Sequence, residues 1–173
     1  GDPANDHPAT MVALNATMVV SGPRGSKREI NVDDFFLGPL WTALQENEIL
    51  TEIKIPILDS KSGGSYQKLE RKVGDYAIAA SAVNLSFDNG ICASAGIGLT
   101  NVGPTPIRAI EAQNALIGTD ISEENIQKAG ELAAEASQPI GDHRGSDEYK
   151  KSVVNTLTKR AIIKAKDRAQ GGN

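Results

Sequence analysis

Residues 65–100, SYQKLERKVGDYAIAASAVNLSFDNGICASAGIGLT, decide the fold of this chain. The stretch divides into an alternating, charged run at 65–72 and two runs of apolar and small residues at 76–87 and 91–100, and each run favours a strand. Asn89-Gly90 lies between the last two runs, and Asn-Gly between apolar runs is a strong signal for a tight hairpin. The sequence therefore predicts three successive antiparallel strands.

Three helices are predicted after these strands. Beyond Pro106 the apolar residues recur with a helical period as far as Gly118, which favours a helix end. A second helix is expected to begin near Ser122 and a third at Ser146, each with acidic residues in its first turn. Residues 146–173 carry seven basic and three acidic side chains. We interpret this cationic helix as solvated, with docking to an acidic partner as the alternative.

Upstream of residue 65 the pattern indicates a short helix and several strands. The expected elements are a helix at 8–14, paired strands at 16–20 and 27–32, a single helical turn at 33–36 capped by Asp33, a loop at 37–48 and a strand at 49–57. The polar stretch 59–64, DSKSGG, has the composition of a linker and is the expected domain boundary. Because strands and helices come in separate blocks, the predicted fold class is α+β.

Composition and charge exclude several classes of function. The chain has 173 residues, of which 39% are hydrophobic and 23% charged, as in an ordinary globular protein. Its net charge of −4 gives no positive field for nucleic acid, which we do not expect as a partner. Cys92 is the only cysteine and there are two histidines, so a disulfide framework or a self-contained zinc or iron–sulfur site is not expected.

The sequence also bears on location and completeness. It contains no apolar run long enough to predict a transmembrane helix and no signal-peptide pattern at its start, so we expect a cytoplasmic chain. A peripheral position at the inner face of the membrane is the alternative. The sequence begins with Gly1 rather than Met, and we expect it to be the later part of a longer protein.

No catalytic set is apparent among the side chains. Cys92 lies in an apolar run, which favours a buried, inert thiol, and His143 lies in a polar loop. Two stretches could bind a ligand. Residues 1–8, GDPANDHP, place carboxylates before a helix, where they could accept hydrogen bonds from a ribose or simply cap the helix. Residues 66–77, YQKLERKVGDYA, combine cations with two tyrosines and could meet a planar, anionic ligand.

Four ordered stretches together resemble one protein family. GDPANDHPA, DDFFLGPLWTALQENEILTEIKIP, YQKLERKVGDYAIAASAV and GIGLTNVGPTPIRAIEAQNAL are similar to the FAD-binding medium subunit of carbon monoxide dehydrogenase and related molybdenum hydroxylases. The resemblance implies that residues 1–57 are the C-terminal part of an FAD-binding domain. It also implies that residues 58–173 are the small C-terminal flavoprotein domain, with three antiparallel strands and three helices.

The resemblance also implies which residues contact FAD. The positions carried over are Asp6, Leu50, Lys68, Asp75 and Tyr76. Asp6 is expected at the ribose or pyrophosphate, Leu50 near the flavin ring, and Lys68 at the polar edge of that ring. Asp75 and Tyr76 are expected to approach the isoalloxazine, with Tyr76 covering one face. Lys72 is the competing cation for the role of Lys68.

The family's glycine-rich loops, which hold the FAD pyrophosphate through backbone amides, do not occur in this sequence. The chain by itself is therefore expected to bind FAD weakly. The implied function is electron transfer from [2Fe–2S] clusters on a small subunit through FAD to a quinone, NAD or another acceptor, with the molybdenum cofactor on a large subunit. Carbon monoxide is the expected substrate of the complex, and purines, aldehydes and N-heterocycles are alternatives. A flavin-free interaction module and an independent flavoenzyme are the competing hypotheses.

Overall fold

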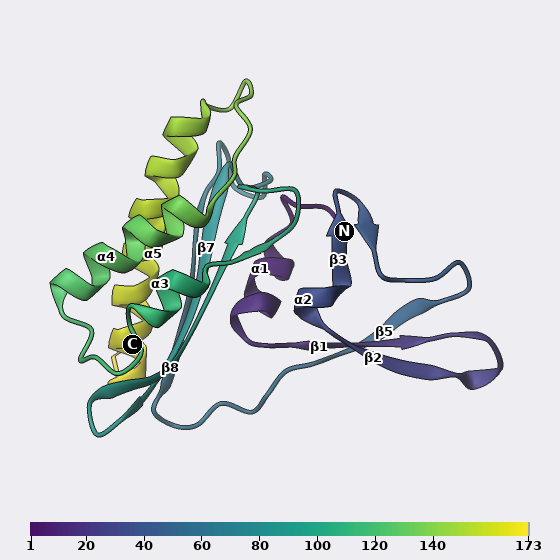
Figure 1. The fold of residues 1–173 in the computed structure, drawn as a ribbon, viewed down its shortest axis with the longest axis horizontal. Coiled ribbons are helices and arrows are strands. Elements are labelled where there is room, and N and C mark those ends of the chain that lie inside the picture. The colour runs from purple at the N-terminus through teal and green to yellow at the C-terminus, as the bar shows by residue number, and fades with distance from the viewer. Residues whose placement is uncertain (173) are drawn as a thin grey trace.

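The computed structural model describes residues 1–172, and a four-stranded antiparallel sheet forms its central layer (Figure 1). The strands are β6 (Ser62–Leu69), β7 (Ala79–Asp88), β8 (Ile91–Thr100) and β9 (Ile107–Arg108), and they lie side by side in this order. The turn between β7 and β8 has positive φ at Asn89 (48°) and Gly90 (83°). These angles suit the Asn-Gly pair that occupies the turn, because both residues tolerate the left-handed region.

Three helices cover one face of this sheet (Figure 1). They are α3 (Ile110–Asn114), α4 (Glu123–Ala136) and α5 (Asp147–Ala169). Ser122 and Asn125 form a capping box at the start of α4, and Ser146 caps α5, as the acidic first turns of both helices suggest. The buried side chains between the layers include Val83, Leu85, Ile97, Leu99, Leu116 and Ile162. The hydrophobic core of residues 62–172 therefore lies between the sheet and these helices.

The other face of the sheet carries α1 (Asp6–Ala13). Gly96 and Gly98 on β8 lie directly beneath the helix. A Cβ atom at either position would fall well inside van der Waals distance of a backbone oxygen, that of Ala13 for Gly96 and that of Ala9 for Gly98. Glycine is required here because the helix backbone approaches the strand so closely. This contact fixes where the N-terminus of α1 lies on the sheet.

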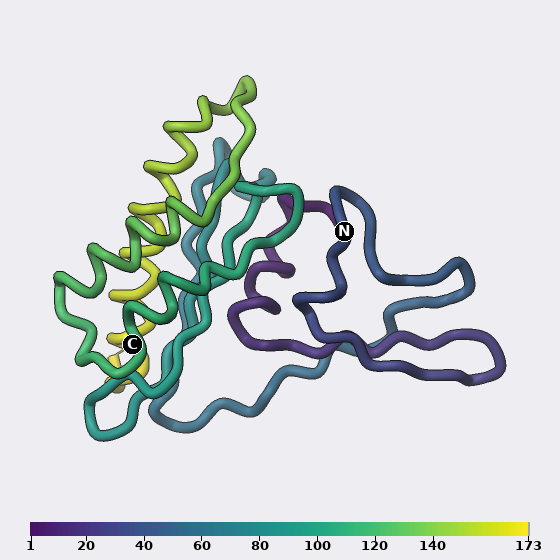
Figure 2. The backbone as a smooth tube through the Cα atoms, viewed as in Figure 1, coloured from purple at the N-terminus to yellow at the C-terminus, as the bar shows by residue number. Residues whose placement is uncertain are grey.

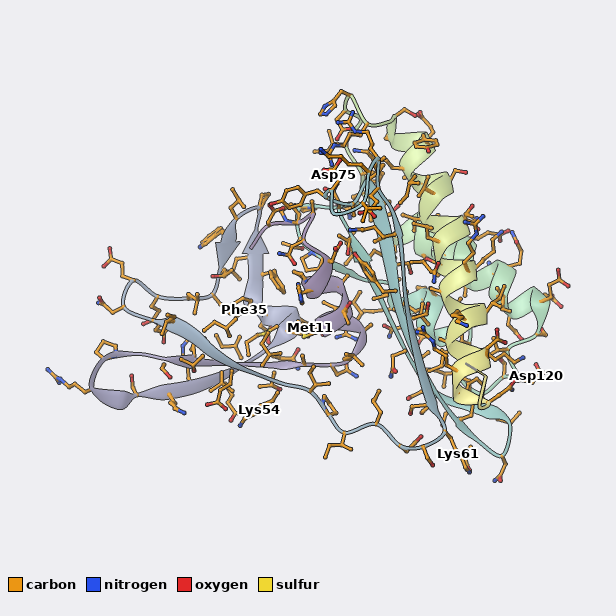
Figure 3. The ribbon with its side chains drawn as sticks, turned by 180° about the vertical axis from the view of Figure 1, so that it is seen from behind. Met11, Phe35, Lys54, Lys61, Asp75 and Asp120 are labelled. Atoms are coloured by element: carbon orange, nitrogen blue, oxygen red, sulfur yellow. The ribbon has the colours of Figure 1, made fainter. Side chains whose placement is uncertain are left out.

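Residues 14–54 form a second, smaller unit beside α1 (Figure 1). Its sheet has the order β2-β1-β5, built from β1 (Thr17–Ser21), β2 (Lys27–Asn31) and β5 (Ile49–Lys54), with a short 3-10 turn, η1 (Pro23–Gly25), in the hairpin. Helix α2 (Val32–Phe35) follows β2 and packs with α1 over this sheet. Met11 and Phe35 belong to the resulting small core (Figure 3). Residues 55–61 then cross to the start of β6 (Figure 2).

The α+β fold class, the hairpins at 17–31 and 79–100, and the helices beginning after Ser122 and Ser146 are confirmed. Other details were wrong. The expected linker at 59–64 overlaps β6, which spans Ser62–Leu69 instead of 65–72, because its pairing with β7 begins at Ser62. Asn31, not Asp33, caps the turn of α2, because Asn31 has the extended backbone that lets its side chain accept from the Asp33 amide (2.9 Å). The expected loop at 37–48 contains β3 (Phe36–Gly38) paired with β4 (Trp41–Thr42). The helix expected after Pro106 is preceded by β9, a fourth strand that pairs with β8.

Candidate functional site

The N-terminus of α1 meets a row of polar side chains on the sheet. Strand pairing sets Lys68 opposite Ala80, and Ala80 opposite Thr100, so these side chains share the face on which α1 packs. Asp6 is the first residue of α1 and reaches this row. Its Oδ1 accepts a hydrogen bond from the Tyr66 hydroxyl (2.8 Å), and its Oδ2 accepts one from Lys68 Nζ (2.9 Å). The helix N-terminus is thereby fastened to β6 by a carboxylate.

Lys68 connects three segments of the chain. Besides Asp6, its ammonium group lies 2.8 Å from Glu70 Oε2 and donates to the backbone oxygen of Asp75 (3.2 Å). Of its three N–H donors, two thus have hydrogen-bond acceptors, Asp6 and the Asp75 backbone oxygen, and Glu70 pairs with the ammonium group as an ion. The bond to Glu70 and then the bond to Asp6 raise the pKa of Lys68, so it stays charged at neutral pH. Lys68 thus ties the start of α1 to the turn that follows β6.

The turn between β6 and β7 is shaped by short-range hydrogen bonds. The Ile78 amide donates to the Leu69 backbone oxygen (2.8 Å), and the Asp75 amide donates to the Lys72 backbone oxygen (3.0 Å). Gly74 has a φ of 83°, which a glycine adopts without strain. The Asp75 side chain is mostly buried, whereas 53% of Tyr76 is exposed. Figure 3 shows Asp75 at the end of the sheet opposite to Lys61.

Two adjoining hollows open where α1 meets this turn. The first has a volume of about 200 Å³ and is lined by Ala4, Asn5, Asp6, His7, Gly74, Asp75 and Tyr76. The second has a volume of about 270 Å³ and is lined by Gly1, Asn5, His7, Pro8, Met11, Met18, Phe35, Phe36, Leu50 and Ile53. They share the side chains of Asn5 and His7. A hollow that includes several polar side chains and a more apolar hollow therefore meet at the first turn of α1.

The structure brings most of the site residues predicted from the sequence close together. Asp6, Asp75 and Tyr76 line the first hollow, and Lys68 contacts both Asp6 and Asp75. Leu50 lies apart from them, on β5, where it is half-buried and lines the second hollow. Lys72, the competing cation, is exposed on the turn. Lys68, rather than Lys72, therefore makes the hydrogen bonds to Asp6 and Asp75.

Sequence reasoning placed Tyr66 and Glu70 in the candidate stretch 66–77 but did not predict their contacts with Asp6 and Lys68. Tyr66 and Glu70 lie two residues before and two residues after Lys68, at the end of β6. This alternation, which puts the three side chains on one face, is the sequence signal for the network. Burial raises the pKa of Tyr66, so its hydroxyl stays protonated and donates to Asp6 at neutral pH.

The Asn5 side chain caps α1 by accepting from the His7 amide (2.9 Å). Asp6 is therefore not the helix cap, which was the alternative interpretation of its role.

Cys92 and His143 do not take part in the hydrogen bonds of this site among residues 1–172. Cys92 is buried, and burial raises the pKa of its thiol to about 11, as expected for an inert cysteine. His143 is exposed in the loop before α5. Within residues 1–172 no group of three or more histidine, cysteine, aspartate or glutamate side chains could hold a metal ion. Among the helices of the same residues, none has the length and apolar character needed to cross a membrane.

Comparison with known proteins gives this site a family. Residues 64–165 match the model of the CO dehydrogenase flavoprotein C-terminal domain, and residues 1–58 match the model of the FAD binding domain in molybdopterin dehydrogenase. The chain belongs to the CO dehydrogenase flavoprotein family. The resemblance inferred from the sequence motifs is thus confirmed.

Individual members of the CO dehydrogenase flavoprotein family match nearly the whole chain. The carbon monoxide dehydrogenase medium chain of Afipia carboxidovorans is 42% identical over 98% of this chain and 59% of its own length. The glyceraldehyde dehydrogenase medium chain of Sulfolobus acidocaldarius is 34% identical over 93% of this chain and 57% of its own. The structure of carbon monoxide dehydrogenase from Hydrogenophaga pseudoflava matches with a TM-score of 0.93 at 41% identity, over 97% of this chain and 58% of the matched chain. The chain thus spans less than two thirds of the length of these relatives.

Proposed function

We propose that this chain is part of the FAD-carrying medium subunit of a molybdenum hydroxylase, most closely a carbon monoxide dehydrogenase. The support is the 42% identity to a carbon monoxide dehydrogenase medium chain over 98% of the chain, together with the paired hollows at the start of α1. We extend the proposal to the domain division, with residues 1–57 as the end of an FAD-binding domain and 58–173 as a C-terminal domain. Helix α1 of the first part packs on the sheet of the second.

The residues around the two hollows have the chemistry that a flavin ring requires. A flavin has a polar, hydrogen-bonding edge and an apolar, methyl-bearing edge. The first hollow offers carboxylate and backbone groups of Asp6 and Asp75 beside the Tyr76 ring, and the second offers side chains such as Met18 and Leu50. The glycine-rich cradle for the pyrophosphate is not found in this sequence. The residues therefore fit the ring of FAD, and other residues must hold its phosphates.

When bound, FAD supplies the two-electron and one-electron chemistry that links iron–sulfur clusters to an external acceptor. The residues of this chain supply position and electrostatics. Lys68 holds the Asp6 carboxylate and the Asp75 backbone in place, so the walls of the first hollow are set before a ligand enters. The half-exposed Tyr76 can offer one face of its ring to a planar ligand. Leu50 can cover apolar ring surface in the second hollow.

The proposal includes partners and location. We infer that a large subunit carries the molybdenum cofactor, that a small subunit carries the [2Fe–2S] clusters, and that a quinone or NAD accepts the electrons from FAD. We place the complex in the cytoplasm or at the inner face of the membrane. Carbon monoxide is the proposed substrate, and it would be oxidised on the large subunit, away from the residues described here.

The native particle provides the test. A tag on this chain in its own organism would allow purification of the intact assembly, followed by measurement of subunit masses, released FAD and molybdenum. We expect FAD in equimolar amount with this chain and co-purification of a molybdenum-containing large subunit. A particle without flavin would contradict the proposal in favour of an interaction module. A flavoprotein that purifies without a molybdenum subunit would contradict it in favour of an independent flavoenzyme.

A further inference from the structure

The loop between α4 and α5 has a fixed tip next to the first hollow. The amides of Asp142 and Gly145 each donate to the other's backbone oxygen (3.0 and 3.1 Å), and the Arg144 amide donates to Asp142 Oδ1 (2.8 Å). Gly145 lies against Tyr149, because a Cβ added to the glycine would come within 2.5 Å of the tyrosine ring. These contacts give Arg144, at the tip, a defined direction.

A buried lysine anchors this loop to α5. Only 4% of the Lys150 side chain is exposed, and its Nζ donates to the Ile140 backbone oxygen and to Asp142 Oδ2, both at 2.8 Å. The hydrogen bond from Lys150 is the largest of the effects that lower the pKa of Asp142, so the Asp142 carboxylate stays ionised at neutral pH. A buried charge held by two acceptors resists displacement, because removing either partner would leave the other unpaired. The loop is therefore rigidly attached to the first turn of α5.

Arg144 crosses from this loop to the turn that lines the first hollow. Its Nη2 lies 3.5 Å from Asp75 Oδ1, and its Nη1 donates to the Tyr76 backbone oxygen (3.4 Å). The side chains of Arg144 and Asp75 are 19% and 14% exposed. Arg71 also lies near Asp75, at 3.9 Å, but is 58% exposed. Arg144 is thus the better shielded of the two arginines beside this carboxylate.

We propose that Arg144 is a positioning residue of the flavin site, holding Asp75 and Tyr76 in place and balancing the negative charge of Asp75 beside the flavin ring. The inference rests on the proposed function, because it assigns a flavin to the hollow that Asp75 and Tyr76 line. Its physical basis is the fixed loop, the anchoring by Lys150 and the double contact of one guanidinium with two adjacent residues. The C-terminal helices thereby influence a cofactor that they do not touch.

The charge balance predicts a direction for the redox potential. Reduction of a flavin adds negative charge to the site, and an uncompensated carboxylate nearby opposes this. Arg144→Gln in the holo complex should therefore lower the midpoint potential of the flavin and weaken FAD binding by about three- to tenfold. It should also speed amide hydrogen exchange in residues 74–77. Arg144→Lys keeps the charge and should recover most of the potential.

The matched control is Arg160→Gln, which removes the same charge from an exposed position on α5. We expect its midpoint potential, FAD affinity and exchange at 74–77 to equal those of the wild type. If a flavin-containing wild type shows the same potential and exchange as Arg144→Gln, this inference fails and the proposed function stands. If the wild-type complex contains no flavin, the proposed function fails, and the flavin role of Arg144 fails with it.

Discussion

The side chain of Lys68 organises the candidate site because it contacts several groups at once. Its ammonium group is shared among Asp6, Glu70 and the Asp75 backbone. The expectation that Lys68 hydrogen-bonds the polar edge of a flavin stays a prediction. Two of its three N–H groups already donate to Asp6 and to the Asp75 backbone oxygen, so at most one is left for such a bond. We therefore regard the holding of α1 and the turn as the principal role of Lys68.

Lys68→Met tests this role against that of Lys72. Loss of the ammonium leaves the carboxylates of Asp6 and Glu70 close together without a counter-charge, so the start of α1 should move away from the turn. We expect flavin retention by the native complex to weaken by about tenfold, measured by equilibrium dialysis. Lys72 lies on the exposed part of the same turn, so Lys72→Met should change flavin retention little. Equal effects of the two variants would contradict the assignment.

Tyr76 is the residue whose ring is most available to a ligand at the first hollow. Because 53% of it is exposed, Tyr76→Ala should leave the folding stability of the chain nearly unchanged. The loss of the ring face should speed flavin release by about three- to tenfold, followed by the recovery of flavin fluorescence. Tyr76→Phe keeps the ring and should behave like the wild type. Unchanged release from Tyr76→Ala would exclude contact with the flavin.

Glu48 gives the chain a pH-dependent contribution to stability. Arg28 donates to both of its carboxylate oxygens, from Nε at 2.7 Å and from Nη2 at 2.6 Å. This pairing, helped by the Gln45 amide, lowers the pKa of Glu48 from 4.5 to about 2. The folded state therefore holds the carboxylate ionised where the unfolded chain would protonate it. The stabilisation is complete above pH about 4.5 and is lost as the pH falls towards about 2.

Glu48→Gln should accordingly lower the melting temperature of the chain at neutral pH and have a shrinking effect as the pH falls from about 4.5 to about 2. Glu46→Gln, an exposed neighbour, serves as the control and should show no such trend. Thermal unfolding followed by circular dichroism over this pH range measures the difference. A Glu48→Gln effect of constant size across the range would show that the carboxylate charge contributes nothing.

Among the elements, α1 matters most for the site because it carries Asp6 and borders both hollows. Its position depends on the close approach to β8 at Gly96 and Gly98. Gly98→Ala should push the helix away from the sheet and cost about 1–3 kcal/mol of the free energy of unfolding, measured by urea denaturation. Gly64→Ala is the control on β6 of the same sheet, since its added Cβ would meet atoms no closer than 3.6 Å. A similar cost for both variants would contradict the close-approach account.

The long elements were predictable from the sequence, and the strands of two or three residues were not. Strands β7 and β8 span ten residues each and carry a clear apolar pattern with an Asn-Gly turn, and α4 and α5 begin with capping serines. The strands β4 and β9 have two residues each, too few for any periodicity to appear. These strands form because partner strands lie beside them, and that arrangement depends on the tertiary structure.

The same distinction applies to the candidate site. The motifs identified Asp6, Lys68, Asp75 and Tyr76, and the structure brings these residues to one end of the sheet. The sequence could not show that Tyr66 donates to Asp6, because this bond depends on how α1 packs across β6. The contact between Arg144 and Asp75 joins residues that are 69 positions apart, and the sequence could not show it either. Contacts between distant elements therefore had to come from the structure.

At the scale of the whole molecule, two units share α1 and are joined by a second contact. Arg108 Nε on β9 donates to both carboxylate oxygens of Asp33 on α2, each at 2.9 Å. Residues 49–58, in the smaller unit and the segment that follows it, also leave large apolar side chains exposed, including Ile49 (65%) and Ile57 (101%). Such exposure is unusual for a free surface. It agrees with a chain that works as one part of a larger flavoprotein, as we propose.

The central claim is that the start of α1 and the turn at 74–76 form a wall of a flavin pocket. A cryo-electron microscopy structure of the native particle tests it most directly. We predict density for an isoalloxazine ring against Asp75 and Tyr76, with its apolar edge directed to the hollow that Leu50 lines and its phosphates held by residues other than these 173. A flavin bound elsewhere in the particle, with Asp75 and Tyr76 facing solvent or another subunit, would contradict the claim.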